Sequence, residues 1–190
     1  MWIDYHSLDS EYETNFMVVV SKCLLLCQKI EKAYRALNGL TAIKNDPTQN
    51  NHMNELYKKY YKNNTLGNSI YAAIQNHETS LIGIISHVYK DVPKLRNYIA
   101  HDVLAGISSI ISEPRLNGIT INDLIDQELK EIYKAIIPLI ELDDLLNCLG
   151  WWINEKENPV NLPIHINYKQ NMVNWIFVGF DEKGYVSDET

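Results

Sequence analysis

The sequence has few of the features of a redox, secreted or membrane protein. It contains three cysteines, Cys23, Cys27 and Cys148, none of them in a C-x-x-C pair. The longest apolar stretch, residues 16–27, is interrupted by a serine and a lysine and is shorter than the ~20 residues that a membrane-spanning helix needs. The first residues show no basic region followed by an apolar run, so we expect no signal peptide. We therefore expect a reducing cytoplasmic location and no membrane partner, with Cys23 and Cys27 buried as small apolar residues.

Basic residues are also scarce, with 17 lysines and arginines against 24 acidic residues, which gives a formal net charge of −7. A broad positive surface for coating nucleic acid is therefore excluded, and any RNA contact has to be local. His52, His77 and His87 are too far apart in the sequence to form a metal-ligand pair at helical spacing. There is no Gly-rich phosphate loop, G-x-S-x-G or H-E-x-x-H motif, and we expect neither a metal nor a cofactor.

What is present is a composition typical of one globular core: 190 residues, 46% of them apolar and 22% charged. Apolar residues recur at helical spacing over most of the chain, so the sequence predicts an all-α, up-and-down helical bundle. The expected helices cover residues 11–38, ended by Gly39, then 52–88 as one bent helix or two in series, a short helix opened by Pro93, and 120–149, with a kink expected at Pro138. Residues 41–51 are expected to form a loop.

The expected core positions follow from the same periodicity. In the first helix they are Phe16, Val19, Val20, Cys23, Cys27, Ile30, Tyr34 and Leu37. In the helix opened by Pro93 they are Leu95, Ile99 and Val103. In the last long helix they are Leu124, Leu129, Ile132, Ile136, Ile140 and Leu145, with an acidic run of Glu141, Asp143 and Asp144 expected to face solvent.

The last part of the chain differs in its pattern. Residues 164–168 alternate apolar and polar side chains, and residues 172–180 are rich in Val, Ile, Trp and Phe. These features predict a small C-terminal β-hairpin. We therefore expect a helical domain over residues 1–157 and a β-hairpin extension with its tail over residues 158–190, packed on the same domain.

One segment of the short helix stands out chemically: Arg96-Asn97-Tyr98-Ile99-Ala100-His101. Asn97 and His101 are four residues apart and share a face, whereas Arg96 is about 140° around an ideal α-helix from His101. One copy of the pair therefore does not converge tightly. Two such helices packed across a twofold axis would place two arginines and two histidines around one shared groove.

This segment resembles the motif of the HEPN domains (higher eukaryotes and prokaryotes nucleotide-binding): an Arg, a polar residue, three to five variable residues and a His. Asn97 is then the polar residue, with four residues between Arg96 and His101. The resemblance implies a HEPN-like helical bundle and a metal-independent endoribonuclease that works as a homodimer. Such proteins often act as the toxin of a toxin–antitoxin system or in abortive infection and antiviral defence, where an antitoxin or another defence-complex protein is a partner.

The resemblance also implies roles for the motif residues. His101 would act in general acid–base catalysis on the RNA 2′-hydroxyl, since imidazole exchanges protons at cellular pH. Arg96 would bind the scissile phosphate, and Asn97 would orient one of these groups or bind substrate. The products would carry 2′,3′-cyclic phosphate and 5′-hydroxyl ends. One subgroup of the family has a modifiable Tyr two residues after the His, where this chain has Val103.

Other interpretations remain open. The domain can instead be a catalytically silent HEPN-like interaction or regulatory module in a defence complex, or an unrelated bundle in which the motif is accidental. Tyr57, Tyr60 and Tyr61, interleaved with Lys58, Lys59 and Lys62, either bury their rings or stack on RNA bases.

Overall fold

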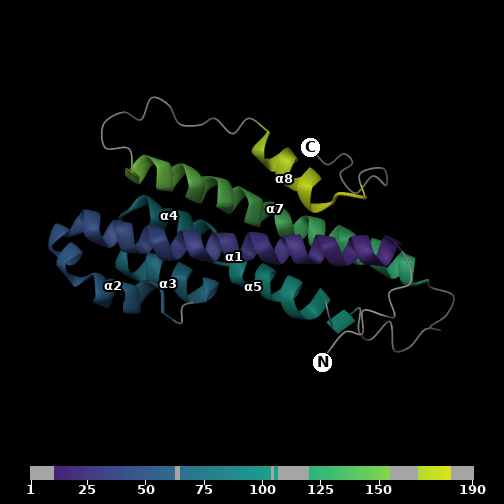
Figure 1. The fold of residues 1–190 in the computed structure, drawn as a ribbon, viewed down its shortest axis with the longest axis horizontal. Helices are drawn as coiled ribbons and strands as arrows, with labels where there is room; N and C mark the ends of the chain where they lie inside the picture. Colours follow the sequence, from purple (N-terminus) through teal and green to yellow (C-terminus); the bar gives the residue numbers. More distant parts are fainter. Residues whose placement is uncertain (1–10, 63–64, 104, 107–119, 155–166, 181–190) are drawn as a thin grey trace. The chain divides into compact units, whose positions relative to one another are not determined.

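A computed structural model describes residues 11–62, 65–103, 105–106, 120–154 and 167–180, apart from the side chains of 151–154. All regular elements among these residues are helical, which confirms the all-α prediction (Figure 1). In chain order they are α1 (Glu11–Asn45), η2 (Pro47–His52), α2 (Met53–Tyr60), α3 (Leu66–Asn76), α4 (Leu81–Val88), α5 (Val92–Asn97), η3 (Tyr98–Asp102), α7 (Ile121–Asn154) and α8 (Tyr168–Ile176). In this described part of the chain, no helix is both long and apolar enough to cross a membrane.

The chain divides into two compact units, each built from separated segments. Unit 1 comprises residues 1–25, 94–137 and 169–190, and unit 2 comprises residues 26–93 and 138–168. The two long helices α1 and α7 each contribute residues to both units. The predicted boundary between residues 157 and 158 lies outside the described residues, so the division at that point stays a prediction.

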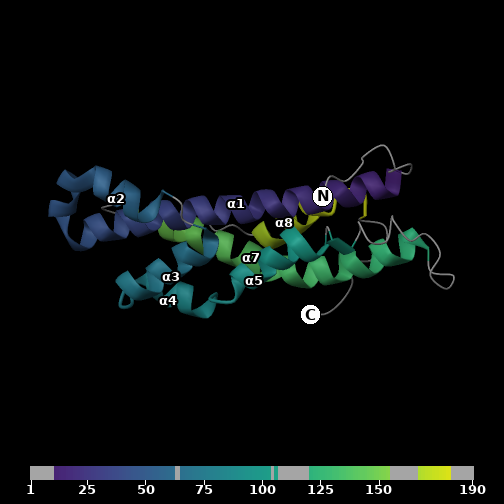
Figure 2. The ribbon, with the colours of Figure 1, turned by 90° about the horizontal axis from the view of Figure 1, so that it is seen from below.

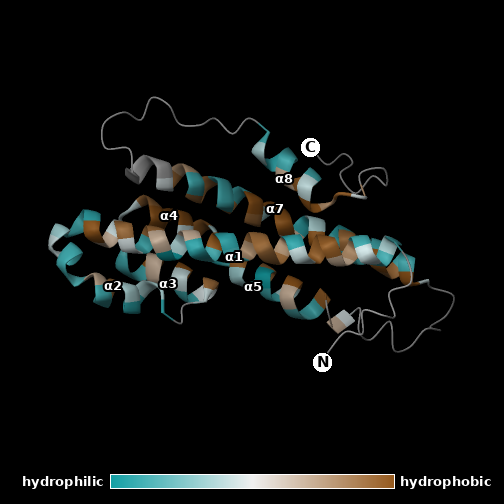
Figure 3. Cartoon of the chain, in the orientation of Figure 1, coloured by the Kyte–Doolittle hydropathy of each residue, from teal (hydrophilic) through white to brown (hydrophobic). Residues whose placement is uncertain are grey.

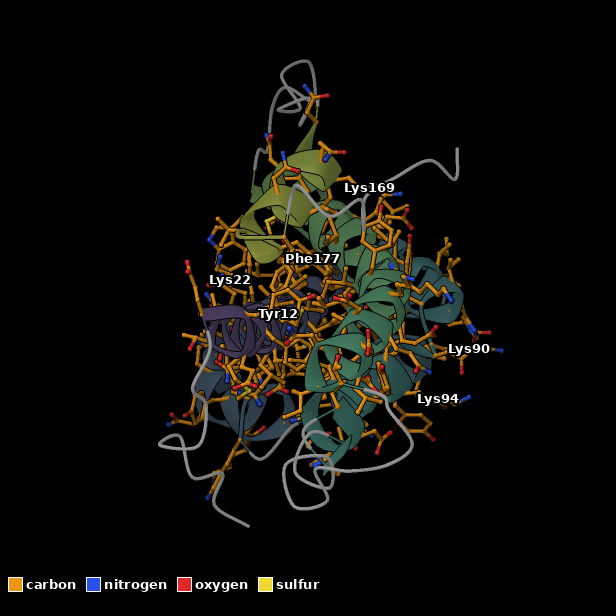
Figure 4. All side chains as sticks on the ribbon, turned by 90° about the vertical axis from the view of Figure 1, so that its right-hand side faces the viewer. Tyr12, Lys22, Lys90, Lys94, Lys169 and Phe177 are labelled. Carbon is orange, nitrogen blue, oxygen red and sulfur yellow. The ribbon has the colours of Figure 1, made fainter. Side chains whose placement is uncertain are left out.

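Unit 1 has an aromatic core. Tyr12 of α1 contacts Phe180 edge to face, with ring centroids 5.2 Å apart, and Tyr133 of α7 contacts Phe177 in the same way at 5.8 Å. Figure 4 shows Tyr12 and Phe177 toward the middle of this unit and Lys22 at its margin. The Lys22 ammonium lies 5.2 Å from the centroid of the Trp175 ring on α8. Segments far apart in sequence are thus joined through aromatic rings, which bury large apolar areas.

Unit 2 is held by polar contacts as well as by apolar ones. The Asn38 side chain donates a hydrogen bond to the Ser69 carbonyl at 2.9 Å, and the Ser86 hydroxyl donates to the Tyr34 hydroxyl at 3.2 Å. These bonds connect α1 to α3 and to α4, which pack on each other (Figure 2). All four residues are buried, so each bond satisfies groups that water cannot reach.

The predicted apolar stripe of α1 is confirmed, because all eight of its residues are buried, including Cys23 and Cys27. Apolar residues recur along this helix in Figure 3. The predicted end at Gly39 is wrong: α1 continues to Asn45. Gly39 lies under the Tyr61 ring, with Tyr61 Cε2 3.8 Å from where its Cβ would be. Gly39 therefore lies inside the helix, and Thr41 beyond it is buried as well.

The middle region forms three helices, more than the one or two expected. Thr65 and Ser80 cap α3 and α4 with their side chains, accepting hydrogen bonds from Asn68 N and Gly83 N. Such caps satisfy the free N–H groups at a helix start, so each marks a new helix. The break between α2 and α3 agrees with the expected alternative of two helices in series, whereas the break between α3 and α4 was not predicted, because apolar spacing continues across it. The expected loop over residues 41–51 is wrong, because α1 continues to Asn45 and Pro47–His52 form the short helix η2, capped by Asp46.

The start of α7 is a capping box. Asp123 N donates to the Thr120 hydroxyl, and Thr120 N donates to the Asp123 carboxylate at 2.8 Å. Leu129, Ile132, Ile136 and Ile140 are buried as predicted, but Leu145 is exposed and Leu124 only half-buried. Asp143 is fully buried, so the prediction of a solvated acidic run is wrong at this position. The physical reason is a polar contact: Lys29 Nζ lies 2.6 Å from its carboxylate, and the Tyr168 hydroxyl donates to it.

The C-terminal β-hairpin is not formed. Residues 168–176 are the helix α8, whereas residues 164–166 of the predicted first strand lie outside the described residues. The buried side chains after Tyr168 are Val173, Ile176, Phe177 and Phe180. Their spacing of i, i+3, i+4 and i+7 is that of a helix face. High β-propensity misled the prediction, because tertiary packing overrides such a preference.

Candidate functional site

The motif residues lie where a helix changes its type. α5 begins at Val92, with Pro93 in its first turn as expected, and passes at Tyr98 into η3, a π-helical turn. The widened turn is seen in the hydrogen bond from Val103 N to the Tyr98 carbonyl, five residues back. π-turns are rare and occur often at functional sites.

The π-turn changes the geometry expected for Arg96 and His101. On an ideal α-helix they would lie about 140° apart. A π-turn takes up more residues per turn, so positions five apart in the sequence lie closer to one face. His101 lies within this turn, whereas Arg96 lies in α5 before it, so the angle of an ideal α-helix does not describe the pair.

Arg96 and Asn97 are joined directly. Arg96 Nη1 donates a hydrogen bond to Asn97 Oδ1 at 3.0 Å. Among the described residues Arg96 forms no ion pair with a carboxylate. This bond uses Oδ1 of Asn97 as an acceptor and leaves the amide N–H groups and the other guanidinium N–H groups as further donors. The two side chains together form a cluster of hydrogen-bond donors suited to an anion such as a phosphate.

His101 is exposed to solvent, as is Asn97, while Arg96 is half-buried. Within the described residues no hydrogen bond joins His101 to either of the other two, so one chain brings Arg96 and Asn97 together but not His101. The opposite face holds the turn in the core: Ile99 and Val103 are fully buried, as predicted, and Leu95 is half-buried. Asn97 and His101 are therefore accessible to solvent, while Ile99 and Val103 hold this helical segment in the core.

Tyr98, which sequence reasoning passed over as a variable residue of the motif, fixes this turn to α7. Its hydroxyl donates to Glu128 Oε2 at 2.8 Å. Burial raises the pKa of Tyr98, and the hydrogen bond to Glu128 and the charge of that carboxylate raise it further. The pairing is not visible in the sequence, because 30 residues separate the two side chains.

The tyrosine cluster of α2 is split by the structure. Tyr60 is buried, which agrees with the first of the two interpretations of this cluster. Tyr57 and Tyr61 are instead exposed, with their rings stacked 5.6 Å apart at an interplanar angle of 11°. The three interleaved lysines are exposed as well.

Three histidines outside the motif, His52, His77 and His87, lie within the described residues. His77 is buried, and burial lowers its pKa, with the charge of Lys59 lowering it further. His52 and His87 are exposed. In the part of the chain that the structure describes, no three His, Cys, Asp or Glu side chains are grouped so as to hold a metal ion.

In comparisons with known proteins, no protein-family model matches the chain, and neither does any curated protein or any solved structure.

Proposed function

We propose that the chain is a metal-independent endoribonuclease of the HEPN type that cleaves RNA through Arg96, Asn97 and His101. The observation that supports the proposal is the segment α5–η3, in which Arg96 and Asn97 end the α-helix, His101 lies in the π-turn that follows, and the buried Ile99 and Val103 hold the segment in the core. A π-turn gives up regular α-helical hydrogen bonding, and an irregularity of this kind that persists in a fold is reason to propose a function.

The roles follow from the chemistry of the three side chains. Arg96, oriented by its bond to Asn97, binds the scissile phosphate and stabilises the charge that develops on it. The exposed His101 exchanges protons with the 2′-hydroxyl or with the leaving 5′-oxygen. Attack of the 2′-oxygen on phosphorus breaks the bond to the 5′-oxygen, so the products carry 2′,3′-cyclic phosphate and 5′-hydroxyl ends. This reaction needs neither a metal nor a water molecule.

The proposed active form is a homodimer. His101 forms no hydrogen bond with Arg96 or Asn97 among the described residues, so a second copy of the turn is needed to complete the site. A twofold axis beside the turn would place the same three residues of a second copy next to them, so no further motif in the sequence is needed. A role in toxin–antitoxin control or antiviral defence, with an antitoxin or defence-complex protein as partner, is part of the same proposal and rests on the family resemblance.

The test is cleavage of a mixed tRNA and mRNA pool in EDTA by the wild-type protein, beside Arg96→Ala and His101→Ala. We expect cutting by the wild type alone. Asn97→Ala should retain part of the activity, since it removes the orientation of Arg96 but not the guanidinium. No cutting by a folded wild-type dimer would instead favour a silent interaction module, and a wild-type monomer would contradict the composite site.

A further inference from the structure

The exposed face of α2 carries a second arrangement that the motif does not use. Tyr57 and Tyr61 expose 59% and 38% of their surface, although tyrosines usually bury their rings. Their near-parallel stacking leaves the rings side by side on the surface. The Tyr61 ring lies beside Gly39 of α1, with its Cε2 3.8 Å from where a Cβ on that glycine would be.

Lysines run beside the two rings. Lys58 follows Tyr57 on α2, and Lys62 follows Tyr61 in the turn after that helix. Both are exposed, and together with Asn54 and Tyr57 they line a surface hollow of about 420 Å³.

The charge of this region is opposite to that of the chain. Residues 44–62 contain four lysines and two carboxylates, whereas the whole chain carries −7. Glu55 is the one acidic residue of α2, and its carboxylate lies 3.7 Å from His52 Nδ1. The region therefore provides a local positive surface of the kind that an acidic protein needs in order to approach a polyanion.

We propose that Tyr57, Tyr61, Lys58 and Lys62 form a binding surface for single-stranded nucleic acid. An unpaired base stacks on the exposed Tyr57 ring and the two ammonium groups contact adjacent phosphates, with Asn54 bonding base or sugar in the hollow. Stacking on an aromatic ring requires an unpaired base, so the surface selects single strands over duplexes. This surface does not depend on the proposed cleavage, because its residues are separate from the motif.

The experiment is anisotropy of a labelled oligo(dT) of about 12 nucleotides with the full chain, at several salt concentrations. DNA lacks the 2′-hydroxyl, so binding is measured without the proposed reaction, and a failure here leaves that reaction to its own test. Tyr57→Ala should weaken binding roughly 5- to 150-fold, while Tyr57→Phe should retain it. The matched control is Tyr71→Ala, which removes an equally exposed tyrosine of α3 and should change nothing.

The lysines are tested by the salt dependence. Lys58→Gln and Lys62→Gln should each reduce the slope of log affinity against log salt by about 0.7. Lys90→Gln is the control, since Lys90 is exposed in the same unit and points away from the ribbon (Figure 4). Glu55→Gln should tighten binding, because it removes the negative charge beside the lysines.

Three results would overturn the proposal. One is equal binding by wild type, Tyr57→Ala and Tyr71→Ala; another is a duplex that binds as tightly as the single strand. The third is a wild-type protein that does not bind the oligonucleotide, together with a Tyr57→Ala variant whose oligomeric state differs from wild type. That result would mean that the surface contacts another protein chain.

Discussion

The Tyr98 hydroxyl donates a hydrogen bond to Glu128 Oε2 at 2.8 Å and so ties the π-turn to α7 within unit 1. Removing the hydroxyl with Tyr98→Phe leaves the partly buried carboxylate without this donor. Because hydrogen bonds to charged groups contribute more than neutral ones, we expect a loss of about 1.5 kcal/mol in the free energy of unfolding. Urea denaturation measures it, with Tyr71→Phe at an exposed site as the unaffected control. An unchanged midpoint for Tyr98→Phe would show that the turn is held by Ile99 and Val103 alone.

Gly83 is required by a close approach of the backbone. A Cβ at this position would lie 2.1 Å from the His77 carbonyl oxygen, which belongs to the main chain and cannot move aside freely. Gly83→Ala should therefore lower the free energy of unfolding by more than about 3 kcal/mol. Gly67→Ala is the matched control: its nearest neighbours are 3.7 Å away, and in a helix it should stabilise by about 0.5–1 kcal/mol. Equal effects of the two changes, measured by thermal and urea unfolding, would contradict the packing of α4 on the His77 turn.

The buried Asp143 depends on Lys29. Burial lowers the pKa of Lys29, but hydrogen bonds with Asp143 and Tyr168 and the charge of Asp143 outweigh it, so the pKa is raised. A raised lysine pKa stabilises the fold at pH values below its unfolded pKa, and the contribution is lost only as the pH rises through the folded pKa. Lys29→Met should therefore lower the free energy of unfolding by about 2–3 kcal/mol at neutral pH. This is a small effect for breaking a buried ion pair, because Lys29 is itself half exposed.

The control for this change is Lys32→Met, at an exposed lysine of the same helix. It should alter the unfolding free energy by less than about 0.5 kcal/mol. A Lys29→Met protein as stable as Lys32→Met would mean that the Tyr168 hydroxyl and the Asn147 amide satisfy the carboxylate without the lysine.

His77 makes the stability of the fold depend on pH. Burial and the charge of Lys59 lower its pKa in the folded protein, so the unfolded chain binds the proton more readily. The resulting stability is present above the unfolded histidine pKa and is lost as the pH falls through the folded pKa. The free energy of unfolding is measured at pH 7.5 and pH 5, which span a histidine pKa of about 6.5. Between these two values it should fall more for wild type than for His77→Phe. His87→Gln, at an exposed histidine, should show the wild-type pH dependence.

Helical periodicity predicted much of this fold, and its failures have identifiable causes. The α1 stripe and the buried Ile99 and Val103 followed directly from spacing. The β-hairpin was mispredicted because Val, Ile, Trp and Phe favour strands, although Val173, Ile176, Phe177 and Phe180 are spaced as a helix face. Spacing was the better guide there, since burial of a continuous face outweighs the local preference of single residues.

The candidate site was predicted in part. The sequence predicted Arg96, Asn97 and His101 on a helix whose other face is apolar. It did not predict the π-turn, because no residue type in the segment distinguishes a π-turn from an α-helix. The contacts of Tyr98 with Glu128, and of Asp143 with Lys29, join residues that are distant in sequence. Such pairs depend on tertiary packing, so neither composition nor periodicity contains them.

The most direct test of the proposed function is the end chemistry of RNA cut in EDTA by wild type, His101→Ala and His87→Ala. His87 is an exposed histidine outside the motif and controls for loss of an imidazole. We predict 2′,3′-cyclic phosphate ends from wild type and His87→Ala, a loss of about 100-fold or more in rate for His101→Ala, and no cutting at a 2′-deoxynucleotide placed at the scissile position. Cleavage by His101→Ala at the wild-type rate, or cleavage that the 2′-deoxy substitution does not stop, would contradict the proposed reaction.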